Sequence, residues 1–175
     1  LRVVAAAKGV PIKDVTVVVL DRPRHDQLSR EIREAGARIK FITDGDVAGA
    51  VMAAREETGI DLLMGIGGTP EGIIAACAMK CLGGEIQGRL WARDDAEHKA
   101  LADRGLSATQ VLTTEELVRG NDCFFAATGI TDGELLSGVR FDRRVVRSQS
   151  IVMRSRSKTI RVINSEHPYS SILTE

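Results

Sequence analysis

The sequence lacks an excess of charge of either sign, because 24 lysines and arginines balance 24 aspartates and glutamates. Proteins that bind nucleic acid electrostatically usually carry a basic excess, so this balance argues against a nucleic-acid partner. The sequence also lacks any apolar run near the roughly 20 residues that cross a bilayer. Its start does not have the pattern of a signal peptide. We therefore expect a cytoplasmic protein without a membrane partner.

Cysteine is scarce and odd in number, with Cys77, Cys81 and Cys123 alone. Cys77 and Cys81 are four residues apart in an alanine-rich stretch, so they share one face of a predicted helix. A two-thiolate metal site needs two further ligands, and no Cys/His pair follows at a suitable spacing. We predict buried thiols that pack as small hydrophobic groups.

The two common nucleotide-binding fingerprints are also missing. Pro70 takes the third glycine position of Gly-x-Gly-x-x-Gly in the stretch Gly65-Ile66-Gly67-Gly68-Thr69-Pro70-Glu71-Gly72. Gly72 is followed by Ile73, not by the Lys-Ser/Thr of a phosphate loop. What remains is a glycine-lined loop that enters a helix, where free N–H groups and the helix dipole favour an anion. The alternative is a plain helix start, with Thr69 as cap and Glu71 in the first turn; the crowding of glycines favours a functional loop.

An alternation of strands and helices is present. The sequence predicts strands at residues 15–20, 38–43 and 61–66, and helices at residues 1–9, 26–35, 47–55 and 69–82. This alternation is typical of βαβ units and a parallel sheet. After Gly84 the pattern changes to strands at residues 87–92, 122–128, 145–154 and 158–163, helices at 94–104 and 113–119, and a loose tail from 167.

Polar residues follow the first two predicted strands where each strand ends. Arg22-Pro23-Arg24-His25-Asp26 follows the first strand and Asp44-Gly45-Asp46 follows the second. Because ligands of open α/β sheets bind outside the carboxyl ends of the strands, these residues and the glycine-lined loop should meet at one edge. Guanidinium groups suit a phosphate. Carboxylates suit sugar hydroxyls or a hard metal ion such as Mg²⁺ or Mn²⁺.

Each of these motifs also has a plainer explanation. The two arginines could form a solvated basic turn, and Asp46 could cap a helix with Gly45 as a turn residue. His25 could act as a general acid or base, or merely as a hydrogen-bonding neighbour. The stretch from Thr128 to Thr131 could face a phosphate or form a simple turn.

Taken together, the motifs resemble the class II fructose-1,6-bisphosphatases of the GlpX type. The resemblance rests on the three stretches above, with Val47-Ala48 after the second, and on Ala127-Thr128-Gly129-Ile130-Thr131, in order and spacing from about Leu1 to about His167. It implies the layered αβαβα fold shared with inositol monophosphatases, of which this chain would be the carboxyl-terminal half, with a mostly parallel sheet flanked by helices. It also implies metal-dependent hydrolysis of fructose 1,6-bisphosphate to fructose 6-phosphate and phosphate in gluconeogenesis.

The resemblance assigns roles to individual residues. It places Glu71 on a divalent ion, Mn²⁺ or Mg²⁺. It places Arg22 and Arg24 on the distal phosphate of the substrate, with Pro23 between them as a further substrate-binding residue. The sugar would be surrounded by four residues: Asp44, Gly45, Asp46 and Gly68. Some family members also act on sedoheptulose 1,7-bisphosphate, and we expect a homo-oligomer.

The resemblance further implies a part that this sequence does not show. Family members have a preceding half that supplies most metal-binding carboxylates, including an Asp-Pro-Leu-Asp-Gly-Thr stretch that is absent here. We therefore expect residues 1–167 to form the substrate-binding carboxyl-terminal half, residues 168–175 to form a tail, and this segment alone to be inactive. The alternatives are a non-catalytic sugar-phosphate-binding module without a metal site and a nucleotide-binding α/β domain, which the missing fingerprints disfavour.

Overall fold

The computed structural model describes residues 1–169, and its first sheet is parallel. This sheet has the strand order β2-β1-β3. The strands and their crossover helices are β1 (Thr16–Leu20), α2 (Asp26–Glu34), β2 (Arg38–Ile42), α3 (Asp46–Ala53) and β3 (Leu62–Leu63). The predicted parallel sheet with helical crossovers is therefore confirmed.

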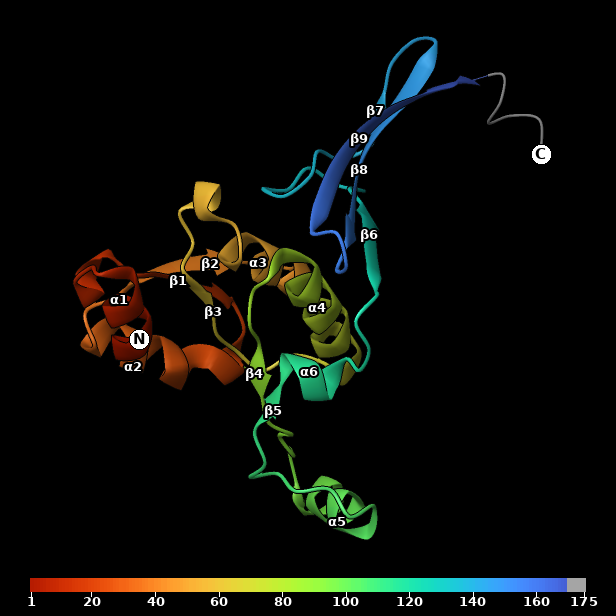
Figure 1. Ribbon diagram of the computed structural model, residues 1–175. Coiled ribbons are helices and arrows are strands. Elements are labelled where there is room, and N and C mark those ends of the chain that lie inside the picture. Colours follow the sequence, from red (N-terminus) through yellow and green to blue (C-terminus); the bar gives the residue numbers. More distant parts are fainter. Residues whose placement is uncertain (170–175) are drawn as a thin grey trace.

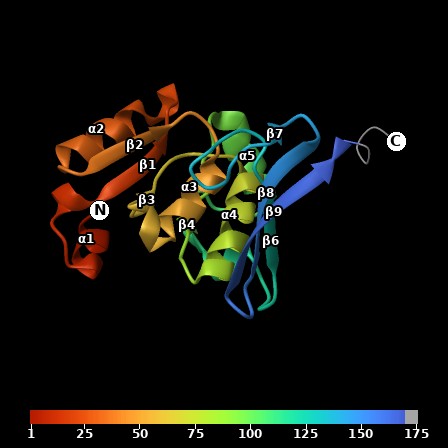
Figure 2. The ribbon, with the colours of Figure 1, turned by 90° about the horizontal axis from the view of Figure 1, so that it is seen from above.

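Helices cover both faces of this sheet. Helices α1 (Arg2–Lys8) and α2 lie on one face, and α3 and α4 (Thr69–Leu82) lie on the other (Figures 1 and 2). Strand β1 is a run of β-branched residues because both of its faces are buried. Val17 and Val19 pack with the α1 and α2 side, whereas Val18 packs with the α3 side.

A second sheet packs on the far side of α3 and α4. Its strands are β6 (Phe124–Thr128), β7 (Arg140–Phe141), β8 (Val145–Arg154) and β9 (Thr159–Pro168), and all their pairings are antiparallel. The expectation of a mostly parallel sheet therefore describes only the first sheet. A short turn between β8 and β9, in which Lys158 has a φ of 52°, permits only an antiparallel pair.

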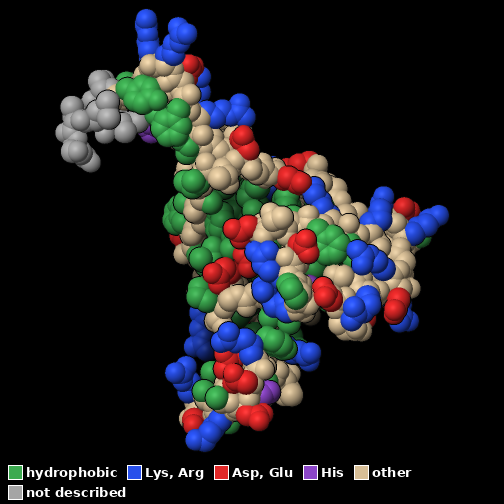
Figure 3. Space-filling view, turned by 180° about the vertical axis from the view of Figure 1, so that it is seen from behind, with side chains coloured by type: hydrophobic (Ala, Val, Ile, Leu, Met, Phe, Trp, Pro, Cys, Tyr) green, Lys and Arg blue, Asp and Glu red, His purple; other side chains and the backbone are tan. Residues whose placement is uncertain are grey.

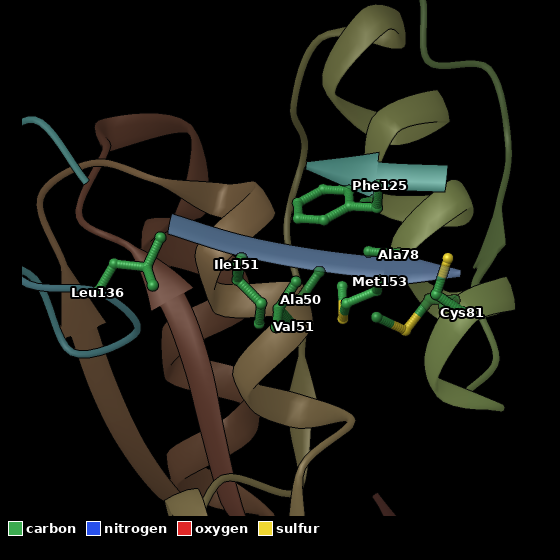
Figure 4. Packing of buried hydrophobic residues seen from close by; sticks show 10 residues of the cluster. Ala50, Val51, Ala78, Cys81, Phe125, Leu136, Ile151 and Met153 are labelled. Atoms are coloured by element: carbon green, nitrogen blue, oxygen red, sulfur yellow. The ribbon is translucent and has the colours of Figure 1, made fainter. Parts of the chain in front are cut away.

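The main core lies between the second sheet and the two helices. Phe125, Ile151 and Met153 point from the sheet toward Val51 of α3 and Ala78 of α4 (Figure 4). Small residues on α4 let the helix approach both α3 and the sheet closely. The described residues thus form four successive layers: helices, parallel sheet, helices and antiparallel sheet (Figure 2). The fifth, helical layer of the αβαβα architecture stays a prediction.

An arm, formed by residues 87–113, projects from this layered body. It comprises β4 (Gln87–Gly88), α5 (Asp95–Asp103) and β5 (Leu112–Thr113), and α6 (Thr114–Leu117) follows at its base. Helix α5 buries none of its residues, and charged side chains of both signs cover the arm (Figure 3). A strand was predicted at residues 87–92, but β4 is only two residues long because its one partner, β5, is equally short.

Two predicted boundaries and one predicted cap differ from the structure. Gly45, with a φ of 82°, caps α3, which begins at Asp46 and ends at Ala53, not at residues 47 and 55. Helix α4 has the predicted bounds 69–82, but its cap is Gly68 and not Thr69. The loose tail was expected from residue 167, but β9 includes Pro168; residues 170–175 lie outside the described residues.

Short 3₁₀ turns complete the described elements: η1 (Ile12–Asp14), η2 (Pro23–His25) and η3 (Glu56–Thr58). Strand β3 is shorter than predicted, although the Met64 N–H still donates to the Val18 carbonyl. Within residues 1–169, no helix has the length and apolar character needed to cross a bilayer.

Candidate functional site

Three loops meet at the carboxyl edge of the parallel sheet. They follow β1 (residues 21–25), β2 (residues 43–45) and β3 (residues 65–68, called the glycine loop below). Arg24 Nε donates to the Ile66 carbonyl at 2.9 Å, which joins the first loop to the glycine loop. On the other side, the Asp46 carboxylate at the start of α3 lies directly against Gly67. The structure therefore brings Arg24, Asp46 and the glycine loop together at this edge, which is called the rim below.

The glycine loop has no room for side chains next to the two carboxylates. A Cβ at Gly67 would lie 2.8 Å from Asp46 Oδ2, and a Cβ at Gly68 would lie 2.1 Å from Glu71 Oε2. Both distances are far shorter than an ordinary van der Waals contact. Glycine at these positions therefore permits the carboxylates of α3 and α4 to approach the loop backbone.

Arg22 and Arg24 make their hydrogen bonds in different places. Arg22 Nη1 donates to the Asp21 carbonyl at 2.8 Å. It lines a pocket of about 340 Å³ at the start of α2, together with Asp21, Asp26, Ser29, Arg30, Arg33 and Phe41. Arg24 uses Nε on the glycine loop, which leaves its terminal nitrogens for other acceptors. Pro23, between them, begins the turn η2 and fixes its backbone.

The loop after β2 is shaped by its own aspartates. Asp44 Oδ1 accepts from the Gly45 N–H at 2.8 Å, and Asp46 Oδ1 accepts from the Val47 N–H at 2.9 Å. Each carboxylate thus uses one oxygen in the turn, and its second oxygen makes no hydrogen bond within residues 1–169. Asp44 is exposed and Asp46 is half-buried. The local role and a binding role are compatible for both residues.

Glu71 is an exposed carboxylate at the start of α4. It lies in the first turn of α4, and its carboxylate makes no hydrogen bond or ion pair with other residues in the described part of the chain. Residues 1–169 contain no group of three His, Cys, Asp or Glu side chains that could hold a metal ion. Mg²⁺ requires near-octahedral oxygen ligation. The donors present fit a metal ion only as part of a larger ligand set.

His25 lies beneath the glycine loop and is not placed as a proton carrier. Its side chain is buried, and both ring nitrogens have backbone partners at 2.8 Å, one on Leu20 and one on Ile66. The contact between His25 and the Ile66 N–H was not predicted from the sequence, because a backbone N–H group leaves no pattern of residue types.

Thr128 is the last residue of β6 in the second sheet, and residues 129–131 follow it. Thr128 Oγ1 hydrogen-bonds Ser150 Oγ at 2.8 Å, and Ile130 is exposed. The loop that follows reaches the parallel sheet through an ion pair between Lys40 and Glu134. Within residues 1–169, no hydrogen bond or ion pair joins the Thr131 side chain to Arg24, Asp46 or the glycine loop, so its role stays a prediction.

The cysteines pack between α4 and β6. Cys81 is fully buried, whereas Cys77 and Cys123 are half-buried. Burial, together with the neighbouring Cys123 thiol, raises the pKa of Cys81 to about 11. A thiol with a raised pKa is a poor nucleophile and a poor metal ligand at neutral pH. The prediction of packing thiols is confirmed for Cys81.

The fold and the rim define an α/β protein whose strand-end loops carry groups suited to a phosphorylated ligand. Comparison with known sequences gives the family. A family model described as bacterial fructose-1,6-bisphosphatase, glpX-encoded, matches residues 1–167. The chain belongs to this family.

Curated relatives carry the name D-fructose 1,6-bisphosphatase class 2/sedoheptulose 1,7-bisphosphatase. Relatives from two Synechococcus strains are each 43% identical over 180 residues, which is 95% of this chain and 52% of the relative. A relative from Trichodesmium erythraeum is 42% identical over 188 residues, 99% of this chain and 54% of the relative. The chain thus spans about half the length of the curated relatives it matches.

Proposed function

We propose that this chain supplies the substrate-binding part of a metal-dependent sugar bisphosphatase. The complete enzyme would hydrolyse fructose 1,6-bisphosphate to fructose 6-phosphate and phosphate in the cytoplasm, as a step of gluconeogenesis. Residues 1–167 would be the carboxyl-terminal half of the αβαβα fold. The single observation that carries the proposal is the junction of the strand-end loops at the glycine loop, through Arg24 and Asp46. Family membership and the names of the relatives support it.

In this proposal the arginines hold the phosphate that is not hydrolysed. Arg22, Pro23 and Arg24 form the end of the site for the distal phosphate, because charge-assisted hydrogen bonds from guanidinium groups are strong and directional. Anchoring this phosphate would orient the reacting end of the sugar and convert binding energy into rate. Since Arg24 is braced by the Ile66 carbonyl, part of its ordering cost is already met before the ligand binds.

The sugar itself would lie over the glycine loop and the loop after β2. Asp44 and Asp46 would accept hydrogen bonds from sugar hydroxyls, and the backbone at Gly45 and Gly68 would approach the ring closely. Such a site accommodates a second sugar bisphosphate of similar shape, and sedoheptulose 1,7-bisphosphate is named for the relatives.

Glu71 would be this chain's ligand to Mn²⁺ or Mg²⁺. The remaining ligands would come from the part of the enzyme outside this chain, because residues 1–169 hold no complete ligand group. A bound divalent ion would activate water and neutralise charge on the phosphate. We further propose a homo-oligomer as the functional assembly.

A non-catalytic sugar-phosphate-binding module is the second candidate. The lack of a three-ligand group in residues 1–169 favours it, since the rim residues would then bind sugar phosphate without turnover. Both candidates predict binding, and they differ in what happens when the other half of a family member is supplied.

Calorimetric titration of the 175-residue chain with fructose 1,6-bisphosphate, with and without Mn²⁺, tests the proposal. We expect binding without phosphate release, and weaker binding for Arg24→Ala. The matched control is Arg104→Ala, which changes an exposed arginine at the end of α5 on the arm. Absence of binding, or equal effects of both variants, would overturn the proposal. Turnover appearing only when a relative's amino-terminal half is added would favour the enzyme over the non-catalytic module.

A further inference from the structure

His25 is the buried histidine of the chain. It is only 1% exposed, whereas His98 and His167 are exposed. It ends the turn η2 and directly precedes α2, so the backbone on both sides of it is held in regular structure. The glycine loop above it is largely exposed and contributes no residue to a helix or strand. The imidazole is therefore a rigid support beneath a loop that has little structure of its own.

The two hydrogen-bond partners of His25 indicate which ring nitrogen donates and which accepts. Nδ1 lies 2.8 Å from the Leu20 carbonyl, which can only accept, so Nδ1 carries the hydrogen. Nε2 lies 2.8 Å from the Ile66 N–H, which can only donate, so Nε2 is an unprotonated acceptor. The ring is thus the neutral Nδ1–H tautomer. With both nitrogens engaged and the ring buried, it has no free site for exchanging a proton with a ligand.

The peptide of Ile66 is held at both of its polar ends. His25 accepts from its N–H, and Arg24 Nε donates to its carbonyl at 2.9 Å. Gly65 brings the backbone close enough for this contact, since a Cβ there would lie 3.1 Å from His25 Cε1. The next two residues, Gly67 and Gly68, are those that lie against Asp46 and Glu71.

We propose that His25 is a positioning residue for ligand binding: as a neutral Nδ1–H imidazole it fixes the Ile66 peptide and, with it, the backbone that faces the Asp46 and Glu71 carboxylates. The ligand class is a sugar bisphosphate, and this part of the inference rests on the proposed function. The two hydrogen bonds that hold the Ile66 peptide, called the clamp below, are present in the unliganded chain. Without the Nε2 acceptor, the glycine loop loses its hydrogen bond to the segment that follows β1.

Two amide variants test the roles of the two ring nitrogens of His25 separately. In His25→Gln the side-chain amide reaches the place of Nε2, so its oxygen can accept from the Ile66 N–H. In His25→Asn the amide reaches only the place of Nδ1, so the Leu20 carbonyl keeps a donor and the Ile66 N–H loses its acceptor. Both variants remove the ring and are expected to lose similar packing, so a difference between them reports on the clamp.

We expect His25→Gln to bind fructose 1,6-bisphosphate within about threefold of the original chain and His25→Asn to bind about tenfold more weakly, which is the effect of one hydrogen bond. In the unliganded chain, amide exchange of Ile66 should be about tenfold faster in His25→Asn, with Val19 in β1 unchanged. Equal affinities or equal exchange rates in the two variants would overturn the positioning role.

The tautomer gives a test that needs no variant. Long-range ¹H–¹⁵N correlation spectra of the chain, which has three histidines, should show one neutral ring with hydrogen on Nδ1 and none on Nε2. A His25 ring that is protonated on Nε2 at neutral pH would contradict the clamp. Failure of the original chain to bind the sugar bisphosphate would count against the proposed function alone, because the exchange and tautomer measurements do not depend on a ligand.

Discussion

Gly67 runs so close to the Asp46 carboxylate that a Cβ on it would lie 2.8 Å from Oδ2. The two residues are far apart in the sequence and come from different crossover units. Their contact exists because β2, β1 and β3 are parallel neighbours, so their following loops share one edge. A substrate over this rim would meet residues from all three loops at once, which links the fold to the proposed function.

Gly68→Ala should disturb binding more than stability. The new methyl group would meet the Glu71 carboxylate, which is the far end of a flexible, exposed side chain and can swing away. We expect the free energy of unfolding to change by less than about 1 kcal/mol. Fructose 1,6-bisphosphate affinity should fall about tenfold, because the new methyl group covers the loop backbone and displaces the Glu71 carboxylate. Urea unfolding and calorimetric titration measure the two effects.

Gly138→Ala provides the contrasting control, away from the rim. A Cβ at Gly138 would lie 2.5 Å from the Asp132 backbone nitrogen and equally near the Thr131 carbonyl carbon, so a backbone segment must move. We expect a loss of about 1–3 kcal/mol of stability, typical of overpacking. The interpretation of Gly68 fails if Gly68→Ala is the more destabilising of the two variants.

Lys80→Met should destabilise the junction between α4 and α6. The Lys80 side chain is only 6% exposed, and Nζ donates to Glu115 at 2.7 Å and to the carbonyls of Val118 and Gly120. Methionine has a similar length but leaves these acceptors without a partner. We expect a loss of about 3 kcal/mol in urea unfolding. Lys99→Met on the exposed arm should change stability by less than about 0.5 kcal/mol; comparable losses would show that Lys80 is not a structural link.

Asp61→Asn should lower the free energy of unfolding at neutral pH and make it depend less on pH in acid. Burial raises the pKa of Asp61, but hydrogen bonds from Lys8 and the Thr16 N–H outweigh it and lower the pKa. Because the pKa of Asp61 is lower in the folded chain than in the unfolded chain, the ionised carboxylate stabilises the folded chain above the unfolded pKa. This stabilisation is lost as the pH falls below about 4. We expect Asp61→Asn to cost about 1 kcal/mol at pH 7 and less at pH 3.

The matched control for this variant is Asp14→Asn. Asp14 also pairs with a basic residue, Arg38, but its side chain is 49% exposed against 14% for Asp61. An exposed pair contributes little, so we expect a change of less than about 0.5 kcal/mol. If both variants lose equal stability at pH 7, burial of Asp61 is not the source of its effect.

Alkaline solution should destabilise the packing of α4 on the second sheet. The Cys81 pKa is raised to about 11 by burial and by the adjacent Cys123 thiol. In the unfolded chain the thiol ionises near pH 8.5, so the raised folded pKa stabilises below that value, and this contribution is lost as the pH rises toward 11. We expect a loss of about 3 kcal/mol over this range. Guanidinium unfolding between pH 8 and 11 should show a shallower decline for Cys81→Ala, and an unchanged decline would assign the effect to other groups.

The parallel sheet was predictable because β1 is an apolar run and because glycines follow the ends of α2 and α4. Val17 to Val19 and the glycines at 36 and 83, with φ values of 85° and 78°, carry this information locally. The extent of β3 and of β4 was not predictable, since it depends on how far a partner strand runs. The cap at Gly45 was missed because Asp46 looks like a cap in sequence, while the left-handed backbone before it decides the start.

The candidate site was predictable as a set of loops but not as a set of contacts. Arg24, Asp46 and the glycine loop were expected at one edge because parallel strands end together. The hydrogen bond of Arg24 to the Ile66 carbonyl could not be predicted, because a backbone group leaves no residue-specific pattern. The divergence of Arg22 toward α2 depends on side-chain direction, which the motif Arg-Pro-Arg does not specify.

A shared binding rim can be tested by titrating the ¹⁵N-labelled chain with fructose 1,6-bisphosphate and following the amide spectra. We expect the amides of Arg24, Asp46 and Gly68 to shift together and to yield one dissociation constant, with the amides of α5 unchanged. Shifts that are absent, confined to a single loop, or governed by different constants in the three loops would contradict a shared binding rim.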